Sequence, residues 1–281
     1  MPEVPSIAVL RRWIALRFRT LRQLAGYATQ AEAAAKLGVP PNRLNHIESG
    51  RNLPSDRLAG QAMALYDAED QLPDLLASLA LARSKTRTRS TAEDPTQFDL
   101  YIGLEQGART IDTFDGFTIH GLLQHKDYAR AVLWGNPSPV ELSSRVRVRM
   151  ERQAILRSSD PTHIWSVLPS NVLHTPVGDE DVMRAQMGHL LDLTELPNVT
   201  LQILPRSASL LASMHTPYAI LRFGMEDDPG VVYVETWRNC VFYEDPAALA
   251  DYTTLTDRLR NSAASPADSR SLIEAVWKGR S

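Results

Sequence analysis

The sequence has almost no cysteine and no long apolar run, and these two absences exclude several classes of protein. Cys240 is the only cysteine among 281 residues, so the chain can form neither an internal disulfide framework nor a zinc site of several thiolates. We expect Cys240 to be buried in an apolar strand, with a reactive thiol as the alternative. No apolar run approaches the roughly 18 residues that span a bilayer, and the N-terminus lacks signal-peptide features. We therefore predict a cytoplasmic protein without membrane contact.

Motifs of catalysis and metal binding are also missing. The histidines of the second half show no metal-ligand spacing such as HExxH, no GxSxG elbow occurs, and the 14 glycines form no phosphate-binding loop. The acidic stretches 179–181 and 226–228 stand beside Gly or Pro, and we interpret them as solvated turns and a helix-capping charge. The sequence therefore predicts no enzyme, no cofactor and no metal site. An enzyme fused to a DNA-targeting domain is the weakest hypothesis.

Charge is divided unevenly along the chain. Residues 1–92 contain 13 Lys and Arg against 8 Asp and Glu, a net +5, whereas residues 93–281 contain 17 against 25, a net −8. Contacts to phosphate supply much of the affinity for DNA, so a basic N-terminal part on an acidic remainder is the sign pattern of a DNA-binding protein. This pattern supports a nucleic-acid partner for the first part of the chain.

The segment 29–54 predicts two short helices joined by a tight turn, and its first half predicts the first of them. Thr29 can cap a helix, and residues 30–37 are rich in Ala, Glu and Lys. Gly38 can end that helix in the left-handed conformation that glycine adopts at little cost. A short helix over 30–37 followed by a turn is therefore expected.

A second helix follows the turn. Pro41 suits a first helical position, and Leu44 and Ile47 recur at helical spacing until Gly50 ends the segment. Two short helices joined by a glycine-containing turn form the helix-turn-helix layout that reads a major groove, and the alternative is a generic helical hairpin. We predict a DNA-binding module whose second helix turns four polar side chains to solvent: Asn42, Arg43, Asn45 and His46.

Further helices complete a helical first domain over residues 1–83. Apolar spacing predicts a helix over 7–24 before the helix-turn-helix segment and two helices after it, over 55–65 and 70–81. Residues 84–97 lose the hydrophobic period and are rich in Ser, Thr and charge. Such composition cannot bury a core, and we predict a linker there.

The pattern of residues 98–281 predicts a second domain of the α+β class. Helical spacing is expected over 142–156, 181–193, 247–262 and 268–278. Short β-branched and aromatic runs, bounded by turn residues, predict strands over 164–168, 199–204, 218–223, 231–235 and 239–243. Because the later strands follow one another at short range as a meander, we expect a largely antiparallel sheet.

The helix-turn-helix segment resembles the Xre/Cro/phage-repressor family. Its carrying residues are Gln30, Ala34, Gly38 and the run Ile47-Glu48-Ser49-Gly50-Arg51. The resemblance implies a five-helix, lambda-repressor-like domain in which Arg22 and Glu48 form a structural ion pair. It implies base contacts from Pro41, Asn42, Arg43, Asn45 and His46. It also implies phosphate contacts from Gln30, Arg51 and Asn52, and Arg11 and Arg12 either join them or are merely solvated.

The second domain resembles the uncharacterised C-terminal domain that follows an Xre-type helix-turn-helix in many actinobacterial regulators, such as the WhiJ-type developmental regulators. The residues that carry the resemblance include Gly121-Leu122-Leu123-Gln124, Tyr128-Ala129-Arg130, Arg149-Met150-Glu151-Arg152-Gln153, Pro197-Asn198-Val199 and Val232-Tyr233-Val234-Glu235. His120 and His125 depart from the family pattern around Gly121–Gln124. The resemblance implies a domain that dimerises and receives a signal, often with a small partner protein.

Three arginines of the predicted helix 142–156 share one face, namely Arg145, Arg149 and Arg152. They form either a site for an anion or acidic partner, or a solvated face neutralised by Glu141 and Glu151.

Two functional hypotheses follow from the sequence. The first is a transcriptional regulator that binds a pseudo-palindromic site on double-stranded DNA as a homodimer, with residues 98–281 dimerising and receiving a small-molecule or protein signal. The alternative is an antitoxin-like interaction protein that sequesters a small partner protein and autoregulates through DNA binding.

Overall fold

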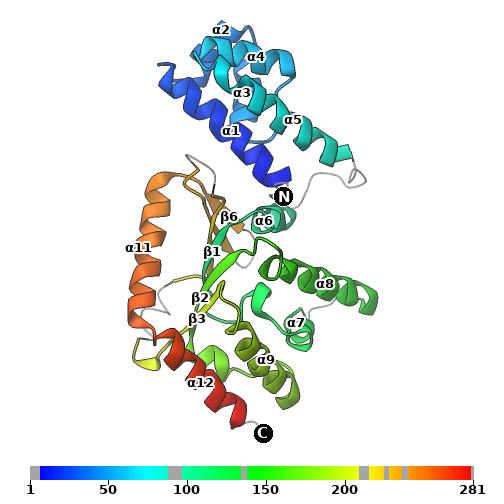
Figure 1. Ribbon diagram of the computed structural model, residues 1–281, viewed down its shortest axis with the longest axis vertical. Coiled ribbons are helices and arrows are strands. Elements are labelled where there is room, and N and C mark those ends of the chain that lie inside the picture. The colour runs from blue at the N-terminus through cyan, green and yellow to red at the C-terminus, as the bar shows by residue number, and fades with distance from the viewer. Residues whose placement is uncertain are drawn as a thin grey trace. The chain divides into compact units, whose positions relative to one another are not determined.

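The computed structural model of the chain describes residues 7–87, 97–133, 138–208, 215–224, 228–235 and 240–279. Contacts divide the chain into two compact units, shown with their element labels in Figure 1. The first unit comprises 1–107 with 225–228, and the second comprises 108–224 with 229–281. Residues 88–96 of the predicted linker lie outside the described residues. The predicted domain limits of 83 and 98 stay predictions.

The first unit is helical, as predicted. Its helices are α1 Ile7–Leu24, α2 Gln30–Leu37, α3 Pro41–Glu48, α4 Asp56–Leu65, α5 Leu72–Arg87 and α6 Gln97–Glu105, with a 3₁₀ turn at Glu69–Gln71. A capping box begins α2, since Thr29 Oγ1 accepts from Glu32 N and Glu32 Oε2 accepts from Thr29 N. Gly38 ends α2 at φ 65°, in the left-handed region where a side chain is strained.

The core of the first unit joins α1 to every helix of the helix-turn-helix. Phe18 and Ile14 of α1 are buried with Leu44 and Ile47 of α3, and Leu79 of α5 completes the cluster. Burying a large apolar side chain contributes about 1.5–3 kcal/mol, so these residues hold α3 firmly against the unit. The opposite side of α3 is left free to face solvent.

The second unit is built on a six-stranded sheet. Its strands are β1 Thr110–Phe114, β2 His163–Pro169, β3 Val199–Leu204, β4 Tyr218–Arg222, β5 Val231–Glu235 and β6 Cys240–Tyr243. They lie in the order β3-β2-β1-β4-β5-β6. β1 pairs in parallel with β2, and β2 with β3, whereas β1–β4, β4–β5 and β5–β6 are antiparallel.

The expectation of a largely antiparallel sheet is wrong, because the sheet is mixed. The α+β class and the later meander are observed, but helices separate β1 from β2 and β2 from β3, and such crossovers make neighbouring strands parallel. Sequence reasoning also missed β1, the central strand from which both halves of the sheet grow. Asp112 interrupts its apolar pattern, and an acidic residue is unusual in a strand interior.

Helices cover both faces of this sheet. They are α7 Lys126–Val132, α8 Pro139–Arg152, α9 Glu180–Leu193, α11 Pro246–Ser262 and α12 Pro266–Lys278. Figure 1 shows α11 on one face, α7, α8 and α9 on the other, and α12 beside β3. Leu249 and Leu259 of α11 pack on Phe114, Val167 and Ile220 of the strands. In the part of the chain that the structure describes, no helix is long and apolar enough to cross a bilayer.

Candidate nucleic-acid interface

Helix α3 presents one polar face to solvent. Pro41, Asn42, Arg43 and Asn45 are exposed, and His46 is half-buried, while the alternate positions Leu44 and Ile47 enter the core. The helix is eight residues long and begins with Pro41 at its first position, so its early side chains project from a free end. In such a position the Asn amides can both donate to and accept from base edges in a major groove, and the Arg43 guanidinium can donate to them.

The residues expected at phosphates lie around this helix. Arg51 and Asn52 are exposed just after α3, and the Asn52 amide donates to the His46 carbonyl at 2.9 Å. Gln30 is half-buried at the start of α2, where its Nε2 donates to Glu48 Oε2 at 2.9 Å. Gln30 therefore already has a structural partner, whereas Arg51 is open to an anion.

The arginines at the start of α1 lie in different environments. Arg11 is half-buried, and its Nε atom is buried without a hydrogen-bond partner in the described residues. Arg12 is only 7% exposed, and its guanidinium binds both carboxylate oxygens of Asp228 at 3.1–3.2 Å. A phosphate contact from Arg12 therefore requires that this ion pair opens first.

A buried ion pair ties α1 to the end of α3. Arg22 Nε and Nη2 donate to the two oxygens of Glu48 at 2.7 and 3.0 Å, and Arg22 Nη1 donates to the carbonyls of Tyr27 and Ala28. The hydrogen bonds that Arg22 donates to Glu48 raise the pKa of Arg22 against the opposing effect of burial. Arg19, which sequence reasoning missed, donates to the Glu48 carbonyl at 2.8 Å. Three polar side chains thus fix the C-terminal end of the exposed helix.

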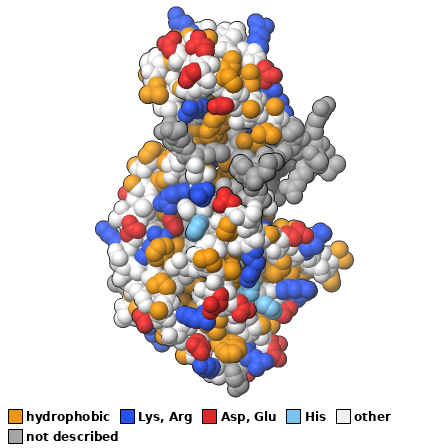
Figure 2. Space-filling model, viewed as in Figure 1, with side chains coloured by type: hydrophobic (Ala, Val, Ile, Leu, Met, Phe, Trp, Pro, Cys, Tyr) orange, Lys and Arg blue, Asp and Glu red, His pale blue; other side chains and the backbone are white. Residues whose placement is uncertain are grey.

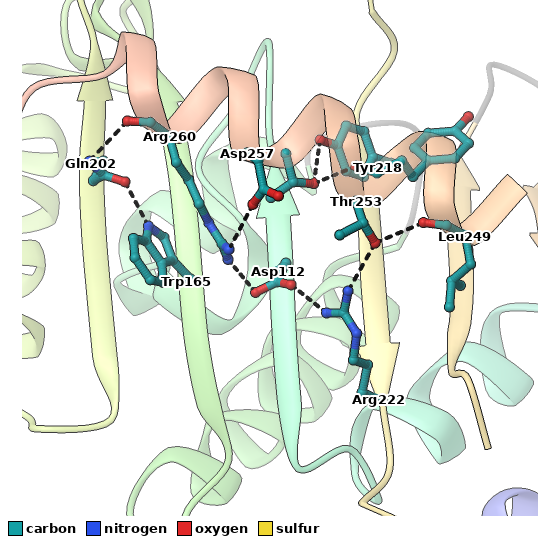
Figure 3. Close-up of polar contacts among 11 residues, drawn as sticks. Asp112, Trp165, Gln202, Tyr218, Arg222, Leu249, Thr253, Asp257 and Arg260 are labelled. Carbon is teal, nitrogen blue, oxygen red and sulfur yellow. Dashed lines mark hydrogen bonds and ion pairs between the residues drawn. The ribbon is translucent and has the colours of Figure 1, made fainter. Parts of the chain in front are cut away.

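In the second unit, a polar network lies between the sheet and α11 (Figure 3). Asp112 of β1 accepts from Arg222 of β4 and from Arg260 of α11, both at 2.5 Å. The Arg260 guanidinium lies 3.9 Å from the ring centroid of Trp165, and Trp165 Nε1 donates to Gln202 Oε1 at 2.8 Å. One carboxylate thus joins two strands and a helix from distant parts of the sequence. The sequence alone gave no indication of this network.

On the opposite face, Asp115 directly follows β1. Its Oδ2 atom is buried and has no hydrogen-bond partner among the described residues. Burial, together with the charge of Glu235, raises the pKa of Asp115 to about 7, although a hydrogen bond with Thr113 acts in the other direction. Asp115 therefore changes its charge close to neutral pH.

His120 is buried a few residues further on. Its Nδ1 accepts from the Leu122 amide at 3.3 Å, and burial with the charges of Arg152 and Arg149 lowers the pKa of His120 to about 3. An imidazole with such a pKa is neutral at physiological pH. His120 consequently acts as a hydrogen-bonding residue and not as a cation.

The three arginines of α8 do not share one environment. Arg145 is exposed and pairs with Glu141, whereas Arg152 is only 5% exposed. Arg149 is half-buried and donates to Gln124 Oε1 at 2.9 Å. The three arginines therefore do not form one continuous anion-binding face. Their role as a partner site stays a prediction.

The segment Gly121–Gln124 is held by side chains from two helices. Gln153 Nε2 donates to the Gln124 carbonyl at 2.7 Å, and Gln186 Nε2 of α9 donates to the Leu123 carbonyl at 2.8 Å. Arg149 and Gln153 therefore contact the segment Gly121–Gln124, although they are distant from it in the sequence. Two of the runs that carry the C-terminal resemblance, Gly121–Gln124 and Arg149–Gln153, are thus packed together.

The remaining titratable side chains of the second unit include no metal-binding cluster among the residues that the structure describes. Within the described residues, no group of three or more His, Cys, Asp or Glu side chains is placed to hold a metal. Cys240 is half-buried on β6, and burial raises the pKa of its thiol. On the face seen in Figure 2, acidic and basic side chains of the second unit are interspersed rather than gathered by sign.

The fold and the exposed face of α3 define the class of protein: the chain carries a helix-turn-helix DNA-binding domain. A family model described as a helix-turn-helix domain matches residues 13–76. A second model, described as a domain of unknown function (DUF5753), matches residues 98–275, and the chain belongs to this family. The predicted combination of a helix-turn-helix with an uncharacterised C-terminal domain is therefore confirmed. Searches of the curated proteins and of the solved structures found no significant match.

Proposed function

We propose that the chain is a non-enzymatic transcriptional regulator that binds a specific sequence of double-stranded DNA as a homodimer. The observation that carries the proposal is the exposed polar face of α3 on a rigidly held helix-turn-helix. Asn42 and Asn45 have side chains that pair with adenine, and Arg43 with guanine. Arg51 and Asn52, exposed after α3, supply the phosphate contacts that fix the register of the helix on the duplex.

A homodimer is proposed because one helix-turn-helix buries too little surface for tight, specific binding. Two copies related by a two-fold axis place their α3 helices in successive major grooves about 34 Å apart and read a pseudo-palindromic operator. The second unit, with its own sheet and core, is the part that holds the two copies together and receives a signal. A ligand or partner that binds more tightly to one spacing of the two helix-turn-helix domains than to another changes the DNA affinity. The size of this change equals the difference between the two binding free energies.

The resemblance to Xre-type actinobacterial regulators supports this proposal over the antitoxin-like alternative. In the alternative, the second unit exists to sequester a small partner protein, and DNA binding only regulates its own synthesis. Purification from the native cell separates the two hypotheses. A stoichiometric small protein partner supports sequestration, whereas a bound metabolite or a DNA-bound dimer without a partner supports the regulator.

Selection from a random duplex pool tests the proposed function with the full-length protein. We expect enrichment of an inverted repeat whose half-sites are about 10 base pairs apart, centre to centre. The matched control combines Asn42→Ala, Arg43→Ala and Asn45→Ala, which changes only exposed residues and leaves the core intact. The proposal fails if the wild-type protein enriches no sequence, or if the triple variant enriches the same one.

A further inference from the structure

The two edges of the sheet are finished in different ways. At the β3 edge, the Ile203 amide donates to Ser269 Oγ at 2.8 Å, and the Ile203 carbonyl accepts from the Ala264 amide at 2.9 Å. Helix α12 packs along the same strand, as Figure 1 also shows. At Ile203 the backbone groups that a neighbouring strand would use are therefore occupied by the chain itself, and α12 packs beside this edge.

The β6 edge carries no such cover in the described part of the chain. Among the described residues, β6 pairs only with β5, and the backbone of 241–243 takes part in no hydrogen bond beyond that ladder. Val241 and Tyr243 are 38% and 36% exposed, which is high for apolar side chains in a sheet. They lie on the α11 face, because they stand opposite the buried Val234 and Val232 of β5.

The composition of β6 lacks the devices that normally keep an edge strand apart from other chains. The strand reads Cys-Val-Phe-Tyr, with no charge and no proline. Natural proteins protect free edges with lysine, proline, bulges or covering segments, because an open ladder of amides and carbonyls pairs with any available strand. Although β6 is short, an uncharged, apolar edge without lysine or proline favours a strand that is paired in the assembled protein.

We propose that β6 pairs in antiparallel fashion with β6 of a second copy, which joins two sheets across a two-fold axis. This inference rests on the proposed function, since a dimer that reads a pseudo-palindromic operator requires a two-fold interface. Two identical edge strands meet antiparallel about such an axis, and the same residues then contribute from both copies. Val241 and Tyr243 of the two strands lie on one face, where Tyr243 already packs on Tyr252 of α11 at a centroid distance of 5.9 Å. The interface therefore extends the apolar core beneath α11.

Sedimentation of the full-length protein tests the proposal. The edge variant combines Val241→Lys and Tyr243→Lys, and the matched control is Val148→Lys, which changes a valine on α8 that is 36% exposed. We expect the wild-type protein to be dimeric, the edge variant to raise the dimer Kd at least about tenfold, and the control to leave it unchanged. Equal Kd values for the edge variant and the wild type overturn the proposal.

Hydrogen exchange of the wild-type protein needs no substitution, so it tests the proposal even if the edge variant fails to fold. We expect the amides of 241–243 that point away from β5 to be protected when the protein is dimeric and to exchange faster after dilution below the dimer Kd. Protection that does not change with concentration in a monomer means that the chain covers its own edge, which also overturns the proposal.

The DNA selection separates this inference from the function on which it rests. If the wild-type protein selects a DNA sequence but the edge variant remains dimeric, the β6 interface is wrong and the proposed regulator stands. If the edge variant dissociates but the wild-type protein selects no DNA sequence, the proposed regulator is wrong and the β6 interface stands.

Discussion

The two units bury their charges in contrasting ways. In the first unit, Glu48 meets Arg22 across 26 residues of sequence, and the pair lies inside one compact motif beneath the exposed face of α3. In the second unit, Asp112 meets Arg222 and Arg260 across 110 and 148 residues. The first pair was expected from the resemblance to the Xre/Cro family, whereas the second joins distant elements and is visible only in the fold. The four predictions below test how far this difference governs stability and function.

The largest expected effect comes from Glu48→Ala. Glu48 is fully buried, and its removal leaves the Arg22 guanidinium without a counterion, which typically costs about 3–5 kcal/mol. Glu48→Gln keeps the side-chain shape and part of the hydrogen bonding, and we expect a smaller loss. Chemical denaturation of the full-length protein, monitored by circular dichroism, measures both. An unchanged free energy of unfolding in Glu48→Ala contradicts the structural role of the pair.

A smaller loss is expected for Asp112→Ala in the second unit. Hydrogen bonds to charged groups contribute about 1.5–3 kcal/mol, and Asp112 makes two, but its arginine partners keep contact with water and screening reduces the effect. We expect a loss of about 2–3 kcal/mol by chemical denaturation. Asp112→Asn is the control, because it keeps the shape and removes the charge. Wild-type stability for Asp112→Ala means that Arg222 and Arg260 are satisfied by solvent.

Much of the first unit followed from the sequence because its signals are local. Thr29, Gly38 and Pro41 each act on the backbone within a few residues, and they place α2 and α3 where the structure has them. Burial on one side of α3 then follows from the spacing of Leu44 and Ile47. The exposed face was therefore predictable without knowledge of the rest of the chain. The bond from Arg19 to a backbone carbonyl was not, since it depends on how α1 crosses α3.

The second unit was only partly predictable because its order is long-range. The later strands and most helices have clear local patterns, but the parallel pairing of β1, β2 and β3 depends on crossovers through α7, α8 and α9. A strand–helix–strand order was the available signal, and the missing β1 concealed it. The run Thr110-Ile111-Asp112-Thr113-Phe114 is rich in β-branched residues. β1 could therefore have been predicted if Asp112 had been interpreted as a buried residue that pairs with a cation.

The pH dependence of stability is expected to reveal Asp115. Because burial raises the pKa of Asp115 to about 7 in the folded state and an unfolded aspartate has a pKa of about 3.9, the folded state binds more protons between these values, and stability falls as pH rises through that window. This difference between the folded and unfolded pKa corresponds to roughly 4 kcal/mol of stability, and because the Asp115 side chain is partly open to water we expect about half of that loss.

Asp115→Asn removes the titration without removing the side-chain shape. We expect the variant to be more stable than the wild type at about pH 8 and to differ little from it at about pH 4. Denaturant unfolding at a series of pH values measures the difference. Parallel curves for the two proteins across this range contradict a titrating Asp115.

Substitutions of two exposed residues of the first unit are expected to change DNA binding without changing stability. Asn42 is exposed on α3, where a bidentate contact to adenine contributes about 1–3 kcal/mol of discrimination, and Asn42→Ala should lose this at one base pair only. Arg51 follows the helix and is expected to meet phosphate, so Arg51→Ala should weaken all sequences alike and lower the salt slope by about 1. Titration of the selected operator, its single-base variants and random DNA at several salt concentrations measures both effects. Equal losses on operator and random DNA for Asn42→Ala reject its role in reading bases, and because neither residue is buried, both variants should keep wild-type stability.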